Sequence, residues 1–236
     1  MNIIISLLFA FSFHAHLSPK MKDIPVLCYH NFFVEPNGKN TLYSVSREHF
    51  REQIRALHDS GYQTILPGEL LAYLTQAAVL PPKPVMITFD DAHATQFSIA
   101  APVLQEFGYK GVFFIMTVVI GKPGYLTTAQ IKSLADSGHI IGCHTWDHPH
   151  LKGEVPIDLK RQLIAPRKQL EKITGKPVYY FAYPFGEWND STIMLLKEQG
   201  FKAAFQLNGK QDNIDSIYTL RRILVPGYLH NLDKLL

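Results

Sequence analysis

The sequence contains little cysteine and carries little net charge, and both features exclude classes of protein. Its 236 residues include two cysteines, so a disulfide framework cannot form. Cys28 and Cys143 both lie inside apolar runs, which favours two buried thiols over a single bridge between them. The formal net charge is only +3, and no basic run is longer than a pair such as Arg221-Arg222. These features argue against a nucleic-acid partner.

Long hydrophobic runs are also missing. The apolar segment from Ile3 to Phe13 is shorter than the roughly 20 residues that span a bilayer, and its length is typical of a signal-peptide core. We therefore expect residues 1–18 to be a signal peptide or a disordered N-terminus. This predicts export to the periplasm, cell surface or medium, with no stable membrane insertion afterwards. No repeat, low-complexity segment or domain boundary interrupts residues 19–236, which are predicted to form one domain.

Predicted strands and helices alternate along the chain, which is typical of an α/β fold with a parallel sheet. The predicted strands are 24–29, 64–66, 84–89, 111–119, 139–143, 178–182, 202–206 and 218–225. The predicted helices are 46–59, 68–76, 97–107, 127–136, 157–174 and 190–199, followed by a short C-terminal helix. Thr127 and Gln130 form a capping box, Asp190-Ser191 caps a later helix, and Pro166 predicts a kink.

Two adjacent carboxylates, Asp90 and Asp91, follow the apolar strand that ends at Phe89. Ionised carboxylates side by side repel each other, and a bound cation would relieve that repulsion. His144 and His148 follow another predicted strand, and their spacing of four lets two imidazoles reach one ion. One carboxylate and two histidines leave metal positions open, as in a catalytic site. The remaining carboxylate is then free to act as a base.

Other polar residues also follow predicted strands, namely His30 after the first strand and Tyr183–Gly186 after 178–182. In a barrel or an open parallel sheet, the carboxyl ends of the strands form the face on which sites are built. Ala92 follows the two carboxylates where a glycine would permit a left-handed backbone. Its presence predicts that the backbone there needs no positive φ.

These residues give the chain a resemblance to the polysaccharide deacetylases of carbohydrate esterase family 4, the NodB-homology domain. Thr88-Phe89-Asp90-Asp91 resembles the first motif of that family and His144-Thr145-Trp146-Asp147-His148 its second, and the likeness spans roughly residues 24–224. Tyr29-His30-Asn31 and Tyr183-Pro184-Phe185-Gly186 look most like the branch that deacetylates poly-β-1,6-N-acetylglucosamine. The resemblance implies a distorted (β/α) barrel of about seven strands.

The resemblance also implies roles for individual residues. Asp91, His144 and His148 would be the metal ligands, with Zn2+ as the default ion and Co2+ or Ni2+ as alternatives. Asp90 would be the general base that takes a proton from a metal-activated water. The backbone N–H of Phe185 would help to bind the oxyanion, and Gly186 would let the backbone turn tightly beside the sugar.

Two positions depart from the family pattern. The third motif of the family commonly opens with an arginine that orients the base, and here that position is Ala182. Arg222 is predicted to replace it, because it shares a strand face with Leu220 and Leu224 and Arg221 points the other way. The alternative is that both arginines are surface charges.

The acid that protonates the leaving amine is the second departure. His230 lies in a Leu-x-His sequence like that of the family, but it opens the predicted C-terminal helix. His30 is therefore the preferred candidate, as acid or as an orienting group. Asp147 is an alternative group for orienting a histidine.

The resulting prediction is a metal-dependent hydrolase that removes N-acetyl groups from an N-acetylglucosamine-containing polysaccharide or oligosaccharide. The alternatives are an O-acetyl xylan esterase or an imidase on the same fold, or a catalytically degenerate glycan-binding module. The expected partner is an N-acetylated glycan, and the sequence leaves the oligomeric state open.

Overall fold

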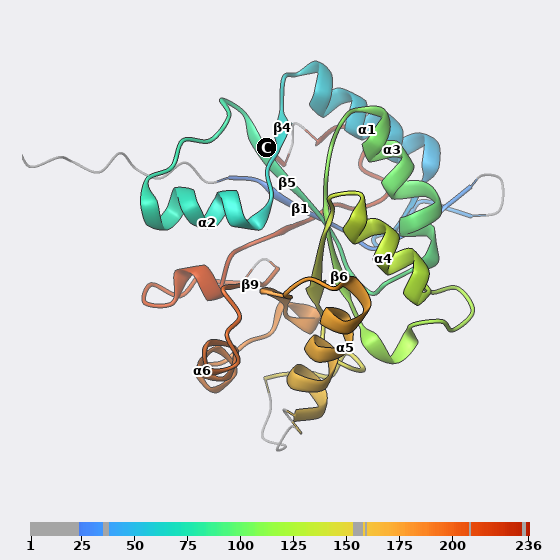
Figure 1. Cartoon of the computed structure of the whole chain (residues 1–236). Coiled ribbons are helices and arrows are strands. Elements are labelled where there is room, and N and C mark those ends of the chain that lie inside the picture. Colours follow the sequence, from blue (N-terminus) through green and yellow to red (C-terminus); the bar gives the residue numbers. More distant parts are fainter. Residues whose placement is uncertain (1–23, 35–37, 153–157, 159, 208, 233–234) are drawn as a thin grey trace, which may run out of the picture.

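The computed structural model describes residues 24–34, 38–152, 158, 160–207, 209–232 and 235–236, so the predicted leader at residues 1–18 lies outside the described part. A parallel sheet forms the centre of the fold, with strand order β10-β1-β5-β6-β7-β8-β9 and β4 paired to β5 (Figure 1). Its strands are β1 (Val26–Tyr29), β4 (Gln63–Thr64), β5 (Pro84–Phe89), β6 (Val112–Ile115), β7 (Ile140–Cys143), β8 (Tyr180–Ala182), β9 (Ala203–Phe205) and β10 (Ile223–Leu224). A separate parallel pair consists of β2 (Asn31–Phe33) and β3 (Ser44–Ser46).

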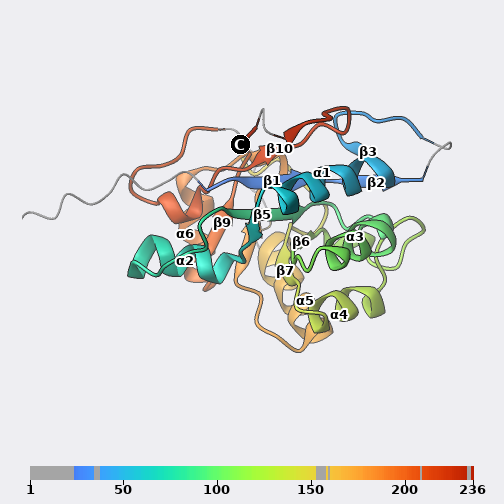
Figure 2. The same cartoon turned by 90° about the horizontal axis from the view of Figure 1, so that it is seen from above.

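In the described part of the chain, six α-helices connect these strands and cover the outside of the sheet on several sides, as the view from above shows (Figure 2). They are α1 (Arg47–Asp59), α2 (Pro67–Gln76), α3 (Ala101–Glu106), α4 (Thr128–Asp136), α5 (Ala165–Thr174) and α6 (Asp190–Glu198). None of the described helices is long and apolar enough to cross a membrane.

The two edges of the sheet are joined by the segment that leads into β10. Leu220 forms a parallel bridge with Phe205 of β9, and its backbone N–H donates to Ala204 O at 3.0 Å. Three residues later β10 pairs with β1, with Ile223 opposite Leu27. One continuous segment therefore links β9 to β1, and the sheet curls into a distorted barrel. The predicted α/β barrel of about seven strands is confirmed.

Alternate residues of the strands face two different hydrophobic cores. One set packs between the sheet and the outer helices and includes Leu27, Ile87 and Phe113. The other set fills the barrel interior, where Met86 and Phe114 belong to one cluster with Leu70 of α2. Leu70 of α2 belongs to this interior cluster, and the chain reaches the site residues at the carboxyl ends of the strands.

Both cysteines are buried and free, as the sequence predicted. Cys28 lies on β1 facing the interior, where its thiol reaches Asp90, and Cys143 belongs to the outer core. Since each thiol lies in a different layer, a bridge between them would require the sheet to be rebuilt.

Several helix and strand boundaries differ from the predictions. The side chain that caps α6 is Asn189, which accepts from the backbone N–H of Thr192, and not Asp190 or Ser191. The predicted helices 97–107 and 157–174 each begin with a π-helical segment, Gln96–Ala100 and Lys160–Ile164. Pro166 lies in the first turn of α5, where the π-helical segment passes into a regular helix.

The remaining differences concern strand ends and the C-terminus. β6 stops at Ile115 because a 3-10 turn, Thr117–Val119, follows it. The predicted strand 218–225 is shortened to a bridge at Leu220 and to β10. Among residues 226–232, Gly227 and Tyr228 form a turn and Leu232 has 3-10 geometry, and the predicted C-terminal helix extends partly beyond the described residues.

The barrel interior is tight enough to make a prediction at Gly142 of β7. A Cβ added there would lie 2.4 Å from the Phe114 ring and 3.1 Å from Tyr180 O. Gly142→Ala should therefore lower the free energy of unfolding by about 1–3 kcal/mol through overpacking. Gly68→Ala is the matched control, because its Cβ would meet only Tyr180 Oη at 3.5 Å. Chemical denaturation of both variants checks this, and equal stabilities would contradict the packing described.

Candidate active site

The predicted site residues meet at the carboxyl ends of neighbouring strands. In the parallel register Tyr29 of β1 lies opposite Phe89 of β5, and Cys143 of β7 lies opposite Phe181 of β8. The chain leaves these strands at His30, at Asp90, at His144 and at Tyr183. Because all four strands point the same way, their following residues share one face of the barrel.

Asp91, His144 and His148 form a compact cluster. The Oδ1 atom of Asp91 lies 3.5 Å from His144 Nε2 and 3.6 Å from His148 Nε2. One ligand atom from each of the three residues lies within 4.8 Å of the other two. Ligands bound tetrahedrally at about 2.0–2.1 Å are roughly 3.3 Å apart, so this spacing suits one shared ion.

The carbonyl of Ala182 fixes the orientation of the His144 ring. It lies 2.8 Å from His144 Nδ1, and a carbonyl can only accept, so the proton of the imidazole sits on Nδ1. Nε2 faces Asp91, to which it donates while the ring is charged, and it can offer a lone pair to an ion once that proton is lost. The sequence offered Asp147 as an alternative orienting group, but its carboxylate accepts from Gln162 Nε2 at 2.8 Å. Ala182, at the position where the resemblance implies an arginine, thus contributes through its backbone carbonyl.

Charges within the cluster shift the pKa values of its members. Burial disfavours the charged form of His144, but Asp90 and Asp91 outweigh it and raise the pKa of this histidine. Burial opposes ionisation of Asp91 too, yet the hydrogen bond and charge of His144 hold the pKa of Asp91 below its usual value. For His148, burial and the neighbouring His144 lower the pKa. His148 is therefore neutral at pH 7 and can offer a lone pair.

Asp90 lies beneath this cluster and is held by Arg222. Two hydrogen bonds of 2.7 Å run from Nη1 and Nη2 of Arg222 to Oδ1 and Oδ2 of Asp90. Burial alone would raise the pKa of Asp90, but the charges of Arg222 and His144 hold it well below its usual range. Arg222 is buried, and its Nε donates to Gln206 O at 3.0 Å. The structure thus places Arg222 in the barrel interior, and the surface alternative is wrong for this residue.

The loops that carry these residues have an unusual backbone. Asp91, Ala92, Thr145, His148 and Phe185 all have positive φ, between 58° and 72°, and they account for five of the six such non-glycine residues among those described. Left-handed backbone is unfavourable for residues with a Cβ, and it clusters at functional sites. The prediction that Ala92 needs no positive φ is wrong, since its φ is 64°. Its small side chain is fully buried, and its carbonyl accepts from Leu126 N at 2.9 Å.

Gln162 braces the loop between His144 and His148, a role that no sequence pattern indicates. Its Oε1 accepts from the backbone N–H of Trp146 at 3.1 Å, while its Nε2 donates to Asp147. Arg161, the preceding residue, stacks on the Trp146 ring at 3.6 Å. Gln162 belongs to a π-helical segment, in which the extra residue per turn changes the direction of side chains. A regular helix pattern would not predict this contact.

Phe185 lies at the rim, where its ring is 49% exposed. The ring meets His148 edge-on at 4.5 Å and stacks on His150 at 4.0 Å. The next residue, Gly186, has a φ of 71°, and a Cβ there would lie 2.6 Å from Leu207 N. Only glycine allows this approach, as the sequence suggested for the turn beside the sugar.

Of the two candidate acids, His30 is the one that reaches Asp90. His30, Cys28 and Asp90 each place a ligand atom within 4.8 Å of the other two. Burial lowers the pKa of His30 despite the opposing charge of Asp90, so its imidazole is neutral at pH 7. The ring of His230 instead lies against the ring of His49 of α1, with ring centres 4.4 Å apart.

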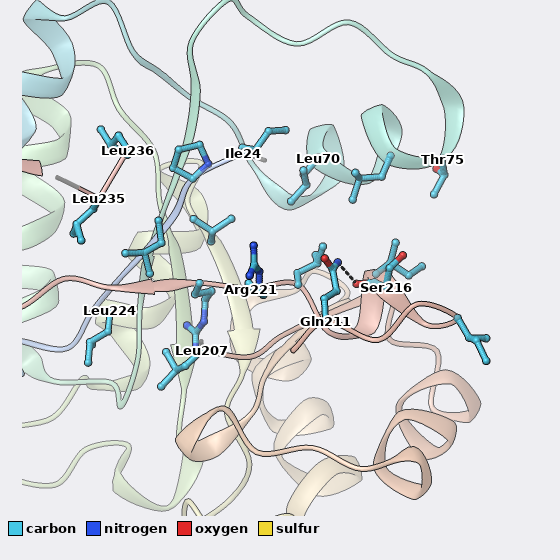
Figure 3. Close-up of a pocket in the computed structure, with 18 of the residues that line it drawn as sticks. Ile24, Leu70, Thr75, Leu207, Gln211, Ser216, Arg221, Leu224, Leu235 and Leu236 are labelled. Atoms are coloured by element: carbon cyan, nitrogen blue, oxygen red, sulfur yellow. Dashed lines mark hydrogen bonds between the residues drawn. The ribbon is translucent and has the colours of Figure 1, made fainter. Parts of the chain in front are cut away.

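A cavity of about 1040 Å³ lies beside β10 (Figure 3). Leu70 of α2, Ile24 before β1 and Leu207 after β9 line it from different sides, and Arg221 lies near its middle. Arg222 is among the described residues that line the cavity, and Asp91, His144 and His148 do not line it. The cavity therefore adjoins the Asp90–Arg222 pair without containing the three-residue cluster.

Comparison with known proteins gives consistent matches. A family model described as polysaccharide deacetylase matches residues 77–204. YxkH of Bacillus subtilis, which carries the name of a polysaccharide deacetylase, is 31% identical over 210 residues, covering 88% of this chain and 74% of YxkH. A poly-β-1,6-N-acetyl-D-glucosamine N-deacetylase of Staphylococcus aureus is 28% identical over 211 residues, covering 82% of this chain and 72% of that enzyme.

A solved structure shows the same fold. The deacetylase PplD of Streptococcus pyogenes, in complex with acetate, superposes with a TM-score of 0.81 at 25% identity, covering 90% of this chain and 96% of PplD. The matched model spans the strands that carry Asp90, Asp91, His144 and Phe185. By sequence and by fold, this chain belongs to the polysaccharide deacetylase family.

Proposed function

We propose that the protein is a metal-dependent hydrolase that removes N-acetyl groups from an N-acetylglucosamine-containing polysaccharide or oligosaccharide. The observation that carries the proposal is the arrangement of Asp91, His144 and His148 at ion-sharing distances directly above a buried, ionised Asp90. Similarity to the Staphylococcus aureus enzyme supports N-acetylglucosamine as the sugar.

Asp91, His144 and His148 would hold a divalent ion, with Zn2+ as the default and Co2+ or Ni2+ as alternatives. One carboxylate oxygen and two imidazole nitrogens are a common donor set for these ions. When bound, the ion would polarise the acetamide carbonyl and make a water molecule more acidic. The Ala182 carbonyl and the strained backbone of Asp91 and His148 hold the donor atoms in place.

Asp90 would accept the proton of the attacking water. The bidentate pair with Arg222 keeps its carboxylate ionised, so it is ready to accept a proton at neutral pH. The N–H of Phe185, presented from a left-handed backbone, would donate to the oxygen that becomes negatively charged. His30, beside Asp90 and neutral at rest, would orient the base, or would take up the proton that Asp90 removes from water and pass it to the departing amine.

The same proposal covers location and partner. An N-acetylated glycan outside the cytoplasm would require export of the chain, and the apolar segment at residues 3–13 suits an export signal. No nucleic acid is expected, because the net charge of +3 is small.

The first test is acetate release by the purified protein from β-1,6- and β-1,4-linked N-acetylglucosamine oligomers. We expect measurable release that Asp90→Asn reduces by at least about 10²-fold, because the amide cannot accept the proton. Acetylated xylan is the comparison substrate. Release from xylan alone would favour the esterase alternative, and no release from any substrate would favour a glycan-binding module.

The second test is metal content. Asp91→Ala and His148→Ala should each lose most of the bound Zn2+, because two remaining ligands hold an ion weakly. His150→Ala is a matched control, since His150 is exposed and pairs with Glu187 at 2.8 Å. Elemental analysis after dialysis against Zn2+ checks this prediction. Stoichiometric metal in either ligand variant would show that the ligands are assigned wrongly.

The third test concerns Arg222. Arg222→Gln should leave Asp90 buried without its cation, so burial would raise the pKa of Asp90 and move the acid limb of the kcat/KM profile to higher pH. Because Asp90 has a depressed pKa when folded, its pairing stabilises the fold above the usual carboxyl pKa. The variant should therefore lose about 3 kcal/mol of unfolding free energy at pH 7, and less in acid.

The matched control for this test is Arg221→Gln, which changes the neighbouring arginine and should leave both quantities near wild type. Adding Asp90→Asn to Arg222→Gln should restore part of the lost stability, because the buried charge is then removed. An unchanged acid limb in Arg222→Gln would contradict the role given to this pair.

A further inference from the structure

Two exposed aromatic side chains stand at opposite ends of a row of histidines. Phe185, after β8, contacts the ring of His148. Tyr43, in the turn before β3, is 53% exposed and meets the ring of His30 edge-on at 5.0 Å. His30 follows β1, and β5, β6 and β7 separate β1 from β8 in the sheet. The two aromatic rings therefore flank the Asp90 and Asp91 region from different sides.

The turn that carries Tyr43 is held by several backbone hydrogen bonds. The carbonyl of Tyr43 accepts from Asn31 N at 2.9 Å, which fixes the turn to the residue after His30. The hydroxyl of Thr41 accepts from the N–H groups of Tyr43 and Ser44, at 3.3 and 3.1 Å. The N–H of Gly227 in turn donates to Thr41 O at 2.7 Å. Tyr43 thus has a fixed backbone and a largely exposed ring.

The C-terminal segment packs directly against this turn. A Cβ added to Gly227 would lie 1.9 Å from the carbonyl oxygen of Ser44, so the two backbones are in direct contact. An exposed ring on such a rigid support loses little freedom when a ligand covers it. Its flat apolar face suits the C–H face of a pyranose ring, and its hydroxyl can bond to sugar hydroxyls.

We propose that Tyr43 contacts the substrate and binds a sugar unit adjacent to the one that loses its acetyl group, on the side away from Phe185. This inference rests on the proposed function and deepens it, because it requires a chain of linked sugars and makes a single N-acetylglucosamine a poor substrate. The competing reading is that Tyr43 only covers His30 with apolar bulk.

The experiment compares Tyr43→Ala, Tyr43→Leu and Tyr43→Phe with wild type on β-1,6- and β-1,4-linked N-acetylglucosamine pentamers. KM comes from acetate release, and Kd comes from calorimetric titration of the same pentamers. Tyr43→Ala and Tyr43→Leu should raise KM and Kd about tenfold with kcat changed less than about twofold, because a stacked ring is lost. Tyr43→Phe keeps the ring and should stay within about threefold of wild type.

Tyr73→Ala is the control, since Tyr73 belongs to α2 and not to the turn that contacts His30. Melting temperatures show whether each variant is folded. Wild-type affinity in Tyr43→Leu would mean that bulk over His30 is sufficient, and equal KM in Tyr43→Ala and Tyr73→Ala would overturn the proposal. If Tyr43→Ala weakens pentamer binding but wild type releases no acetate, the proposed function is contradicted and the contact between Tyr43 and the glycan stands. Absence of both binding and release would contradict both.

Discussion

The buried pair of Asp90 and Arg222 is the interaction on which the rest of the structure depends. The two residues are 132 positions apart, and their side chains are 3% and 0% exposed. Burying either charge alone would cost several kcal/mol, so each is tolerated only because the other is present. Arg222 lies on the segment that joins β9 to β1, two residues after the bridge at Leu220. The segment that closes the barrel therefore also carries the cation that keeps the proposed base ionised.

Neighbouring groups support this pair from within the barrel. Thr88 Oγ1 lies 3.3 Å from Arg222 Nη1, and the Arg222 guanidinium lies over the Phe114 ring at 5.3 Å. Most of the guanidinium donors thus face an oxygen or an aromatic face, as a buried cation requires. The Cys28 thiol adds a weak contact to Asp90 Oδ2 at 3.6 Å, and burial raises the pKa of that thiol, so it stays protonated.

The loops above the pair carry strain that the barrel below stabilises. Left-handed backbone at five non-glycine residues costs of order 1–3 kcal/mol at each position. Hydrogen bonds such as Gln96 Nε2 to Asp90 O and His148 N to Thr145 Oγ1 hold these conformations. Asp91 and His148, two of the strained residues, bring their side chains to within 3.6 Å of each other. Much of the fold's packing therefore serves to keep these few residues in place.

The sequence predicts the parts of this architecture that depend on local patterns. Apolar runs and turn residues locate the strands, and the spacing of Asp90, Asp91, His144 and His148 locates the site. Alternation along the last strand even indicates that Arg222, and not Arg221, faces Asp90.

What the sequence does not predict depends on tertiary contacts. A positive φ at Ala92 is imposed by burial and by a bond to Leu126, and alanine itself gives no sign of it. The brace by Gln162 depends on a π-helical segment, whose side-chain directions the 3.6-residue period misplaces. The sequence does not reveal the orienting role of the Ala182 carbonyl, because every residue has a backbone carbonyl. In each case a backbone group or an irregular turn replaces the side chain that a motif would name.

The charges of the site explain why an arginine is needed below the cluster at all. The charges of Asp90 and Arg222 cancel each other. Asp91 then carries the remaining negative charge of the site, beside imidazoles that are neutral when they act as ligands. The raised pKa of His144 reports the negative field that the carboxylates create. A divalent cation held by Asp91, His144 and His148 would bring the local charge to about +1, whereas without Arg222 it would be about zero. A positive remainder favours negative charge developing on a carbonyl oxygen, so Arg222 would strengthen catalysis without touching the substrate.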